Sequence, residues 1–475
     1  MSDREQEKAA KRAQWEEINR AKAAAKQKGQ ESPAESRMGA THKQFQSIRG
    51  TRDLLPSETQ LWNHVEQAAH EVFATFGFGE IRVPIFEPTE LFARAVGGDT
   101  DIVSKEMYTF SDRPDPRSSQ TAAADGEAIS ISLRPEATAS VCRAYIEHSM
   151  GQLPQPVKLY YRGPMFRRER PQKGRYRQFY QIGAEVLGGT DAPAIDAEVI
   201  EMVMTFFDRL QLEGTELSIN SIGHSAPDCR PKYVELLREE LRKVKDHLGA
   251  DSQRRIETNP LRVLDSKLEH EQAIIEKLPR IAEHLCPACA AHYAAVKHNL
   301  DLRGVKYQEN WRLVRGLDYY MRTTFEITAK GLGSQNAVCG GGRYDGLVEL
   351  LGGPPTKGIG FAIGEDRLIL SLQEAGKAPV AQGPSVFIAW MGQGAYETAV
   401  RGAQKLREAG ISVELPPTEL KFGKALERAS KMNAKHALIM GENEIKEGQW
   451  TLKTLSDGTQ QKLTEAQLLD FLKAV

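Results

Sequence analysis

A basic loop between two strand-like segments constrains this chain more than any other feature of its sequence. Residues 156–162 are predicted to form one strand and residues 178–186 the next. From Arg167 to Arg177 the loop carries six basic residues and one acidic residue. Guanidinium groups at this density suit phosphate oxygens, which they can bind bidentately. The pattern predicts a hairpin that binds a polyanion, with a solvated hairpin tip as the alternative.

The second of these strands separates polar from apolar side chains. Alternate residues of a strand point to opposite faces of the sheet. Gln181, Gly183 and Glu185 therefore share one face, and the opposite face is apolar. A glycine between an amide and a carboxylate leaves room for a ligand to lie against the sheet. The alternative is an edge strand whose glutamate is solvated.

The length and composition point to a soluble protein with several domains. A chain of 475 residues is long enough for two or three domains of roughly 150 residues each. The net charge is -1, so affinity for nucleic acid would depend on local basic patches. No segment approaches the ~18 consecutive apolar residues of a membrane helix. The first residues lack an apolar signal segment, so we expect a cytoplasmic protein.

Changes in composition indicate the domain boundaries. Residues 1–44 form a charged extension that we expect to be disordered or helical, with an RNA-binding arm as the sharper alternative. A core domain is predicted over 45–380, with a charged, helical insertion at about 223–305. Strand and helix patterns alternate in 384–475, which predicts a small α/β domain with a largely parallel sheet.

The folded part is predicted to open with a long helix and an edge strand. Ser57 and Gln60 have the spacing of a capping box at a helix start. Apolar residues then recur at helical spacing, and Gly77 is the predicted stop. Residues 81–84 are predicted to be a strand, confined by Pro84 to an edge or an interface.

Two glycine-rich segments suggest close approach to a ligand. Three glycines follow Cys339, and they permit either close contact with a flat ligand or a flexible turn. Residues 358–364 are a glycine-spaced strand whose spacing misses the dinucleotide fingerprint by one residue. No GxxxxGK[ST] phosphate loop occurs in the chain. A bound nucleotide would therefore be held in another way.

Five cysteines are too few for a disulfide scaffold in a chain of this length. Cys286 and Cys289 have the spacing of half a zinc site, with Cys229, His284 and His292 as possible completions. The sequence holds no second close pair of cysteines. Ordinary reduced thiols are therefore preferred over a metal, and no metal site is predicted.

Over nearly all of its length after residue 45, the chain resembles the class II histidyl-tRNA synthetases. The helix and strand that end at Pro84 resemble the first class II motif, a dimer-interface element, while 161–185 and 358–368 resemble the second and third. Three further segments of this chain resemble motifs specific to the histidine enzymes, at 133–138, 313–320 and 339–346. The resemblance implies an α+β catalytic core with an antiparallel sheet, the helical insertion, and a C-terminal α/β anticodon-binding domain.

The resemblance also implies which residues bind histidine. The amino group of histidine would be bound by Glu136, Thr138 and Gln181. Those that meet the imidazole would be Glu185 and Tyr320, with Tyr319 beside them. From the residues alone, the two tyrosines could equally belong to the core.

Four arginines are implied to bind ATP or to assist the reaction. Arg167 would hold the α-phosphate and the substrate carboxylate, and Arg315 would face the α-phosphate; both would be catalytic. Arg175 and Arg367 would bind the nucleotide. The reaction implied is ATP-dependent charging of tRNA(His) with L-histidine by a homodimer, with Mg²⁺ neutralising phosphate charge.

Three departures from the family pattern accompany the resemblance. Ala137 stands where many relatives have glycine, and Glu365-Asp366 replaces the more usual Leu-Glu. Ser252 and Ser266 stand where some relatives have cysteine, which argues further against zinc. The main rival function is a synthetase-like regulatory subunit of histidine biosynthesis, which would lack the anticodon domain and the full arginine set. A class II synthetase for another amino acid is the second rival.

Overall fold

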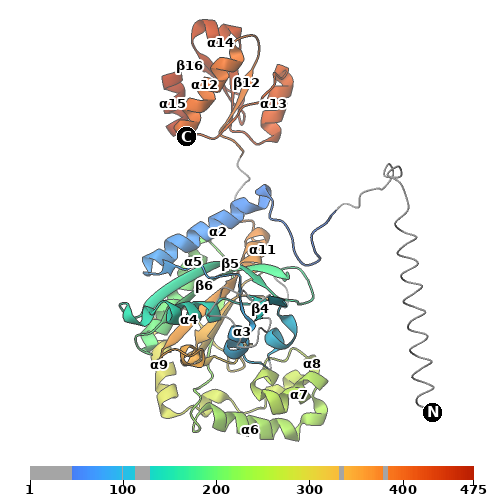
Figure 1. The fold of residues 1–475 in the computed structure, drawn as a ribbon, viewed down its shortest axis with the longest axis vertical. Helices are drawn as coiled ribbons and strands as arrows, with labels where there is room; N and C mark the ends of the chain where they lie inside the picture. The colour runs from blue at the N-terminus through green and yellow to red at the C-terminus, as the bar shows by residue number, and fades with distance from the viewer. Residues whose placement is uncertain (1–44, 99, 113–128, 331–335, 378–382, 475) are drawn as a thin grey trace, which may run out of the picture. The chain divides into compact units, whose positions relative to one another are not determined.

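The computed structural model describes residues 45–98, 100–112, 129–330, 336–377 and 383–474 (Figure 1). The predicted N-terminal extension, 1–44, lies outside the described residues. Among the described helices, none combines the length and the apolar character needed to cross a membrane.

An eight-stranded sheet forms the centre of the larger folded region. Its strands lie in the order β1-β5-β6-β11-β10-β9-β7-β8. Their bounds are β1 Gly79–Glu80, β5 Val157–Phe166, β6 Gln178–Leu187, β7 Glu216–Ser221, β8 Gln308–Glu309, β9 Met321–Thr328, β10 Ala337–Arg343 and β11 Gly358–Gly364. Only the two outermost pairs, β1 with β5 and β7 with β8, are parallel. The predicted antiparallel core sheet is therefore confirmed.

Four helices cover one face of this sheet: α2 (Pro56–Thr75), α5 (Pro193–Arg209), α9 (Pro287–Leu302) and α11 (Glu365–Glu374). Their apolar side chains share one core with the inner strands, and Figure 1 shows α2, α5 and α11 alongside the sheet. Phe73 lies at its centre, with ring centroids 5.6 Å from Phe206 and 5.9 Å from Phe361. This face of β6 is the apolar face that strand alternation predicts.

Part of the opposite face packs under α3 (Thr89–Val96), α4 (Thr138–Glu147) and α10 (Leu347–Leu350). A three-stranded sheet precedes α4 and comprises β2 (Phe86–Pro88), β3 (Thr109–Asp112) and β4 (Ile129–Leu133). Tyr161, Met165 and Leu187 join the strands to these helices in a second apolar core. The polar residues of β6 point to this side of the sheet, where the cavity lies.

The predicted cap of the first helix is wrong, whereas its predicted stop is confirmed. Helix α2 begins at Pro56, so Leu55 is the capping residue and Ser57 already lies inside the helix. Proline suits this first position because it has no N–H to satisfy. Glu58 reaches back and accepts a hydrogen bond from the Leu55 N–H at 3.5 Å. Gly77, with φ +80°, follows the end of the helix.

The predicted edge strand lies two residues earlier than expected. Strand β1 pairs in parallel with β5 at the edge of the sheet, and 81–84 continue as coil. Arg134 takes the carbonyls of this coil, because its Nη1 donates to Val83 O at 2.8 Å and Pro84 O at 3.3 Å. The edge position is confirmed. For residues 83 and 84, the buried Arg134 side chain supplies the hydrogen bonds that a neighbouring strand would otherwise make.

The helical segment between β7 and β8 contains α6 (Arg230–Lys243), α7 (Ala250–Thr258), α8 (Glu269–Ile275) and α9. Residues of the first three helices enclose a core of their own around Tyr233, Leu237 and Leu241. Helix α9 instead contributes Val296 and Leu300 to the core of the large sheet. Composition alone does not distinguish these two kinds of helix.

The C-terminal region has a five-stranded sheet in the order β13-β12-β14-β15-β16. Strands β12 (Val386–Trp390), β13 (Val413–Glu414) and β14 (His436–Met440) are parallel, and α12 (Ala395–Glu408) and α13 (Phe422–Lys431) connect them as predicted. The antiparallel strands β15 (Trp450–Thr454) and β16 (Gln460–Leu463) were not predicted. The remaining helices are α14 (Glu442–Glu447) and α15 (Glu465–Ala474).

A turn between β15 and β16 explains the missed hairpin. Asp457 accepts hydrogen bonds from the Thr459 N–H at 2.9 Å and hydroxyl at 2.7 Å, and Gly458 has φ +75°. An Asp-Gly pair flanked by segments of alternating hydrophobic residues is a hairpin signal. The sequence therefore contains a hairpin signal at Asp457-Gly458, which the alternating strand and helix pattern obscures.

Candidate active site

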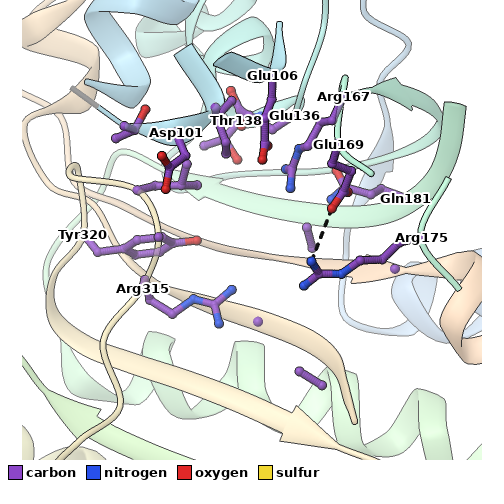
Figure 2. A pocket seen from close by; sticks show the side chains of 18 of the residues that line it. Asp101, Glu106, Glu136, Thr138, Arg167, Glu169, Arg175, Gln181, Arg315 and Tyr320 are labelled. Carbon is purple, nitrogen blue, oxygen red and sulfur yellow. Dashed lines mark hydrogen bonds and ion pairs between the residues drawn. The ribbon is translucent and has the colours of Figure 1, made fainter. Parts of the chain in front are cut away.

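A cavity of about 710 Å³ opens on the polar face of the large sheet (Figure 2). This volume is within the usual range for small-molecule sites. Nine of the ten predicted site residues line it, and the exception is Glu185. They come from β6, from the loop between β5 and β6, from the starts of α4 and α11, and from the loop before β9. Segments far apart in the sequence thus meet around one space.

Glu136 is held at the start of α4. Its carboxylate accepts hydrogen bonds from the Thr138 N–H at 2.7 Å and the Ala139 N–H at 3.1 Å. Burial raises the pKa of Glu136, and these two N–H groups act in the opposite direction. Figure 2 places Glu136 and Thr138 on the same wall of the cavity. A buried carboxylate fixed in this way suits a cationic ligand group.

Glu185 lies directly behind Thr138. The Thr138 hydroxyl donates to its Oε1 at 2.7 Å, and the Tyr344 hydroxyl donates to its Oε2 at 2.6 Å. Burial raises the pKa of Glu185 to about 8, although both hydroxyls oppose the shift. The solvated edge-strand alternative is wrong, because β6 pairs with β5 on one side and β11 on the other.

The glycines of β11 make room for the buried Glu185–Tyr344 pair. A Cβ at Gly360 would lie 1.6 Å from Glu185 Oε2, and one at Gly358 would lie 2.3 Å from the Tyr344 ring. Real Cβ atoms essentially never show contacts this short, so a side chain at either position would force its neighbours to move. The glycine spacing of 358–364 therefore serves the floor of the site, which explains its mismatch with a dinucleotide fingerprint.

The three glycines after Cys339 lie in β10, an inner strand, so the flexible-turn alternative is wrong. A Cβ at Gly340 would lie 1.9 Å from Arg315 Nη2. At Gly341 it would lie 2.5 Å from the Gly360 carbonyl oxygen. The first glycine thus makes room for the arginine, and the second permits close packing of β10 on β11.

The arginines of the cavity are each oriented by a neighbouring oxygen. Arg167 Nε donates to Pro135 O at 3.0 Å, and its guanidinium lies over the Phe179 ring. Arg315 Nη1 pairs with Glu326 at 3.0 Å. Arg175 pairs with Glu169 at 3.3 Å, the contact dashed in Figure 2. Because a guanidinium has five N–H groups, these bonds orient it while others can reach a ligand.

Arg367 completes the set from the first turn of α11. Its Nη1 donates to Ala337 O at 2.8 Å. Burial lowers the pKa of Arg367, and the nearby positive charge of Arg175 adds to this effect. The four arginines therefore concentrate positive charge in a partly buried space, which favours a polyanionic ligand.

Two family models match the chain. One, described as histidyl-tRNA synthetase, matches residues 50–368, and the other, described as an anticodon binding domain, matches 385–475. The chain belongs to the histidyl-tRNA synthetase family. A histidine–tRNA ligase of Koribacter versatilis (strain Ellin345) is 51% identical to this family member over 433 residues, or 90% of this chain and 96% of that protein.

Solved structures agree with this family. The crystal structure of apo histidyl-tRNA synthetase from S. aureus aligns with a TM-score of 0.73 and 36% identity, over 90% of this chain and 100% of that one. An ATP phosphoribosyltransferase regulatory subunit/histidyl-tRNA synthetase from Bacillus halodurans C aligns with a TM-score of 0.60 over 84% and 98%. At 19% identity the second likeness shows the fold alone.

Sequence reasoning missed several residues of this synthetase-family site. Tyr344 lies in a segment already singled out, yet only the structure shows that its hydroxyl holds Glu185. Glu169 and Glu326 line the cavity and pair with its arginines. Arg262 and Asn259 of the helical insertion also line it. In a segment so rich in charge, nothing in the sequence marks which polar residues face the site.

Proposed function

We propose that the protein charges tRNA(His) with L-histidine in two steps. Histidine and ATP first form histidyl-adenylate and pyrophosphate. The histidyl group then passes to a hydroxyl of the terminal ribose of the tRNA, and AMP is released. The observation that carries this proposal is the single cavity that holds both Glu136, suited to an ammonium group, and four arginines suited to phosphates. Membership in the histidyl-tRNA synthetase family supports it.

The first step requires positioning and charge stabilisation. A carboxylate oxygen of histidine attacks the α-phosphorus, and the bond from that phosphorus to the β-phosphate bridging oxygen breaks. Negative charge develops on the phosphoryl oxygens, where Arg167 and Arg315 are proposed to act. Their contacts with Pro135 and Glu326 hold the guanidinium groups in place before the reaction. No protein nucleophile is required.

Histidine is proposed to bind with its ammonium group near Glu136, Thr138 and Gln181. Gln181 Oε1 is buried and has no hydrogen-bond partner among the described residues, so it can accept from an N–H donor. Discrimination against other amino acids would come from polar groups that they leave unpaired.

The imidazole ring is proposed to meet Tyr319, Tyr320 and Glu185. Tyr319 and Tyr320 line the cavity with ring centroids 4.7 Å apart. Glu185 needs one rearrangement, because the Thr138 hydroxyl covers its Oε1. Rotation of that hydroxyl toward the ligand would open the path.

The carboxylates of Glu169 and Glu326 fit a magnesium ion bound with the phosphates of ATP. Both line the cavity beside arginines, and Mg²⁺ is usually held by one or two carboxylates together with substrate phosphates. When bound, the ion would neutralise phosphate charge. The two carboxylates also orient Arg175 and Arg315, independently of any ion.

Residues 384–475 are proposed to form the anticodon contact, and 45–380 the catalytic core with its insertion at about 223–305. We also propose a cytoplasmic homodimer. Ile85, Phe86 and Phe110 expose 43%, 55% and 46% of their surfaces near the first class II motif, and exposed apolar side chains of this size favour an interface. Light scattering should give twice the mass of one chain, and a monomer at all concentrations would contradict the dimer.

The regulatory-subunit alternative is not favoured. The anticodon-domain model matches 385–475, and all four arginines line the cavity. A regulatory protein that only binds histidine needs neither feature.

ATP–pyrophosphate exchange with each of the twenty amino acids tests the proposal, using purified protein without tRNA. Exchange with histidine alone is expected. Exchange with another amino acid would move the activity within class II. Binding of histidine without any exchange would favour the regulatory alternative.

A further inference from the structure

Three cysteines and one histidine converge where the helical insertion joins the large sheet. His224 and Cys229 lie in the connection from β7 to α6, and Cys286 and Cys289 lie at the start of α9. His224 Nδ1 is 3.2 Å from Cys289 Sγ and 3.7 Å from Cys286 Sγ. One atom from each of the four residues lies within 4.8 Å of all the others. The three thiols are buried, and His224 is half-buried.

These distances fit a closed tetrahedral site. Zinc bonds of about 2.3 Å to sulfur and 2.0–2.1 Å to nitrogen place neighbouring ligand atoms roughly 3.5–3.8 Å apart in a tetrahedron. Both His224–thiol distances are near that range, so small shifts would complete the geometry. Three cysteines with one histidine are also a standard ligand set for structural zinc, and thiolates favour this metal over hard cations.

The backbone around the four residues is built to bring them together. Cys229 precedes the first turn of α6, and Cys286 precedes the first turn of α9, so both lie at helix N-termini that favour thiolates. Gly223 has φ +65°, and a Cβ there would lie 2.9 Å from Cys229 Sγ. The glycine thus permits the turn that brings His224 beside the thiols.

The structure replaces the completions that spacing alone suggested for the Cys286–Cys289 pair. His284 packs against the Tyr233 ring, and His292 Nε2 lies 3.1 Å from Asp191 O, so neither belongs to the group. His224 takes that place from 62 residues before Cys286. A third thiol and an imidazole around the pair favour a metal over the ordinary thiols expected from the sequence.

We propose that His224, Cys229, Cys286 and Cys289 bind one Zn²⁺ ion as a structural site. The ion ties the start of α6 to the start of α9, and so joins the insertion to a helix that packs on the large sheet. A redox pair made of Cys286 and Cys289 is the competing use of the same residues. All five cysteines of the chain are free thiols in this structure.

The site also lies next to the strand that follows Tyr320. Arg230, the neighbour of Cys229, donates from Nη1 to Tyr320 O at 2.5 Å. The Arg322 N–H donates to Gly223 O at 2.7 Å, one residue before His224. Metal binding therefore fixes the segments that flank Tyr320, without placing any metal ligand in the cavity.

Metal analysis of the full chain, purified without chelators from zinc-supplemented cells, tests the proposal. One zinc per chain is expected in the native protein and in Cys142→Ala, which removes a buried thiol of a different core. Cys229→Ala and Cys289→Ala should each lose the ion. A native protein without stoichiometric zinc, or variants that retain it fully, would overturn the site.

Two further measurements test the site even if the alanine variants do not fold. The native protein reconstituted with Co²⁺ should show sulfur-to-cobalt charge-transfer bands, and their absence would contradict the thiolate ligands. His224→Cys should keep one zinc because four cysteines also form a zinc site. Isolation of the native protein with a Cys286–Cys289 disulfide and no metal would establish the redox pair instead.

Discussion

The two large sheets of the protein differ in what they bury. In the C-terminal sheet, helices α12 and α15 pack on one face and α13 on the other, and every residue of β14 is buried. Among described residues 383–474, the buried polar side chains are His436 and Thr451. The large sheet instead buries the carboxylate of Glu185 on its cavity side, next to the buried Glu136. It also buries Arg343, which pairs with Asp196 of α5.

This difference separates a region that gains stability from apolar burial from one in which buried charges lower it. A sheet covered by apolar helices on both sides gains from burial throughout. Buried charges are costly unless they are hydrogen-bonded. The carboxylates of Glu136 and Glu185 are held by N–H and hydroxyl groups, and Arg343 is held by Asp196. The polar side chains of the large sheet therefore line a cavity, whereas the C-terminal sheet buries mainly apolar side chains on both faces.

The largest effect is expected from removal of a charge on the polar face. Arg315→Ala should lower the rate of ATP–pyrophosphate exchange by about 10²–10³-fold, because the guanidinium is proposed to meet charge that develops in the transition state. Histidine binding, measured by calorimetry, should change little. Equal losses of binding and rate in a folded variant would refute the assignment.

A matched pair of glycine substitutions compares the two sheets directly. In Gly340→Ala the new Cβ would meet Arg315 Nη2 at 1.9 Å, and displacement of the arginine should slow exchange about 10- to 100-fold. In Gly402→Ala it would meet the Trp450 ring at 2.5 Å. That clash should destabilise the C-terminal region by about 1–3 kcal/mol.

The two variants should therefore separate the half-reactions. Gly402→Ala should leave exchange intact while tRNA charging falls at temperatures that unfold the C-terminal region. If Gly402→Ala impaired exchange as much as Gly340→Ala, the two sheets would not be functionally separate.

The smallest expected effect concerns Glu365, a carboxyl buried outside the cavity. Both of its oxygens lack hydrogen-bond partners among the described residues, and burial raises its pKa to about 8. The folded state thus holds a proton that the unfolded chain releases near pH 4.5, so stability falls as pH rises from about 4.5 to 8. The slope from this group is on the order of 1 kcal/mol per pH unit.

Glu365→Gln should remove this contribution. Urea unfolding at pH 6 and pH 8 should show a smaller loss of stability for the variant than for the native protein. Glu185 titrates in both proteins, so the difference between them reports on Glu365. Equal pH dependence would mean that Glu365 is ionised in the fold.

Periodic patterns predicted the parts of this protein that are governed by local rules. Alternation in β6 gave the correct apolar and polar faces, and the first helix ends where glycine indicated. The predicted cap failed because Pro56 occupies the first helical position. The strand at 81–84 failed because the carbonyls there are taken by Arg134, 50 residues away in the sequence.

The site shows the same limit. The family motifs named nine residues that line the cavity, yet the reasons for the glycines lie in distant partners such as Arg315 for Gly340 and Glu185 for Gly360. His224 joins Cys286 across the insertion in the same way. Local spacing carries no information about such pairs, because chain folding alone creates them.

The hydrogen bond from Arg230 to the Tyr320 carbonyl has a thermodynamic consequence. It links one side of the proposed histidine pocket to the start of α6, so that binding at one place affects binding at the other. If an ion beside Cys229 tightens histidine binding by some factor, histidine must tighten the hold on that ion by the same factor. Scarcity of the amino acid would then make the protein easier to strip of its metal, and scarcity of the metal would raise the histidine concentration needed to fill the pocket.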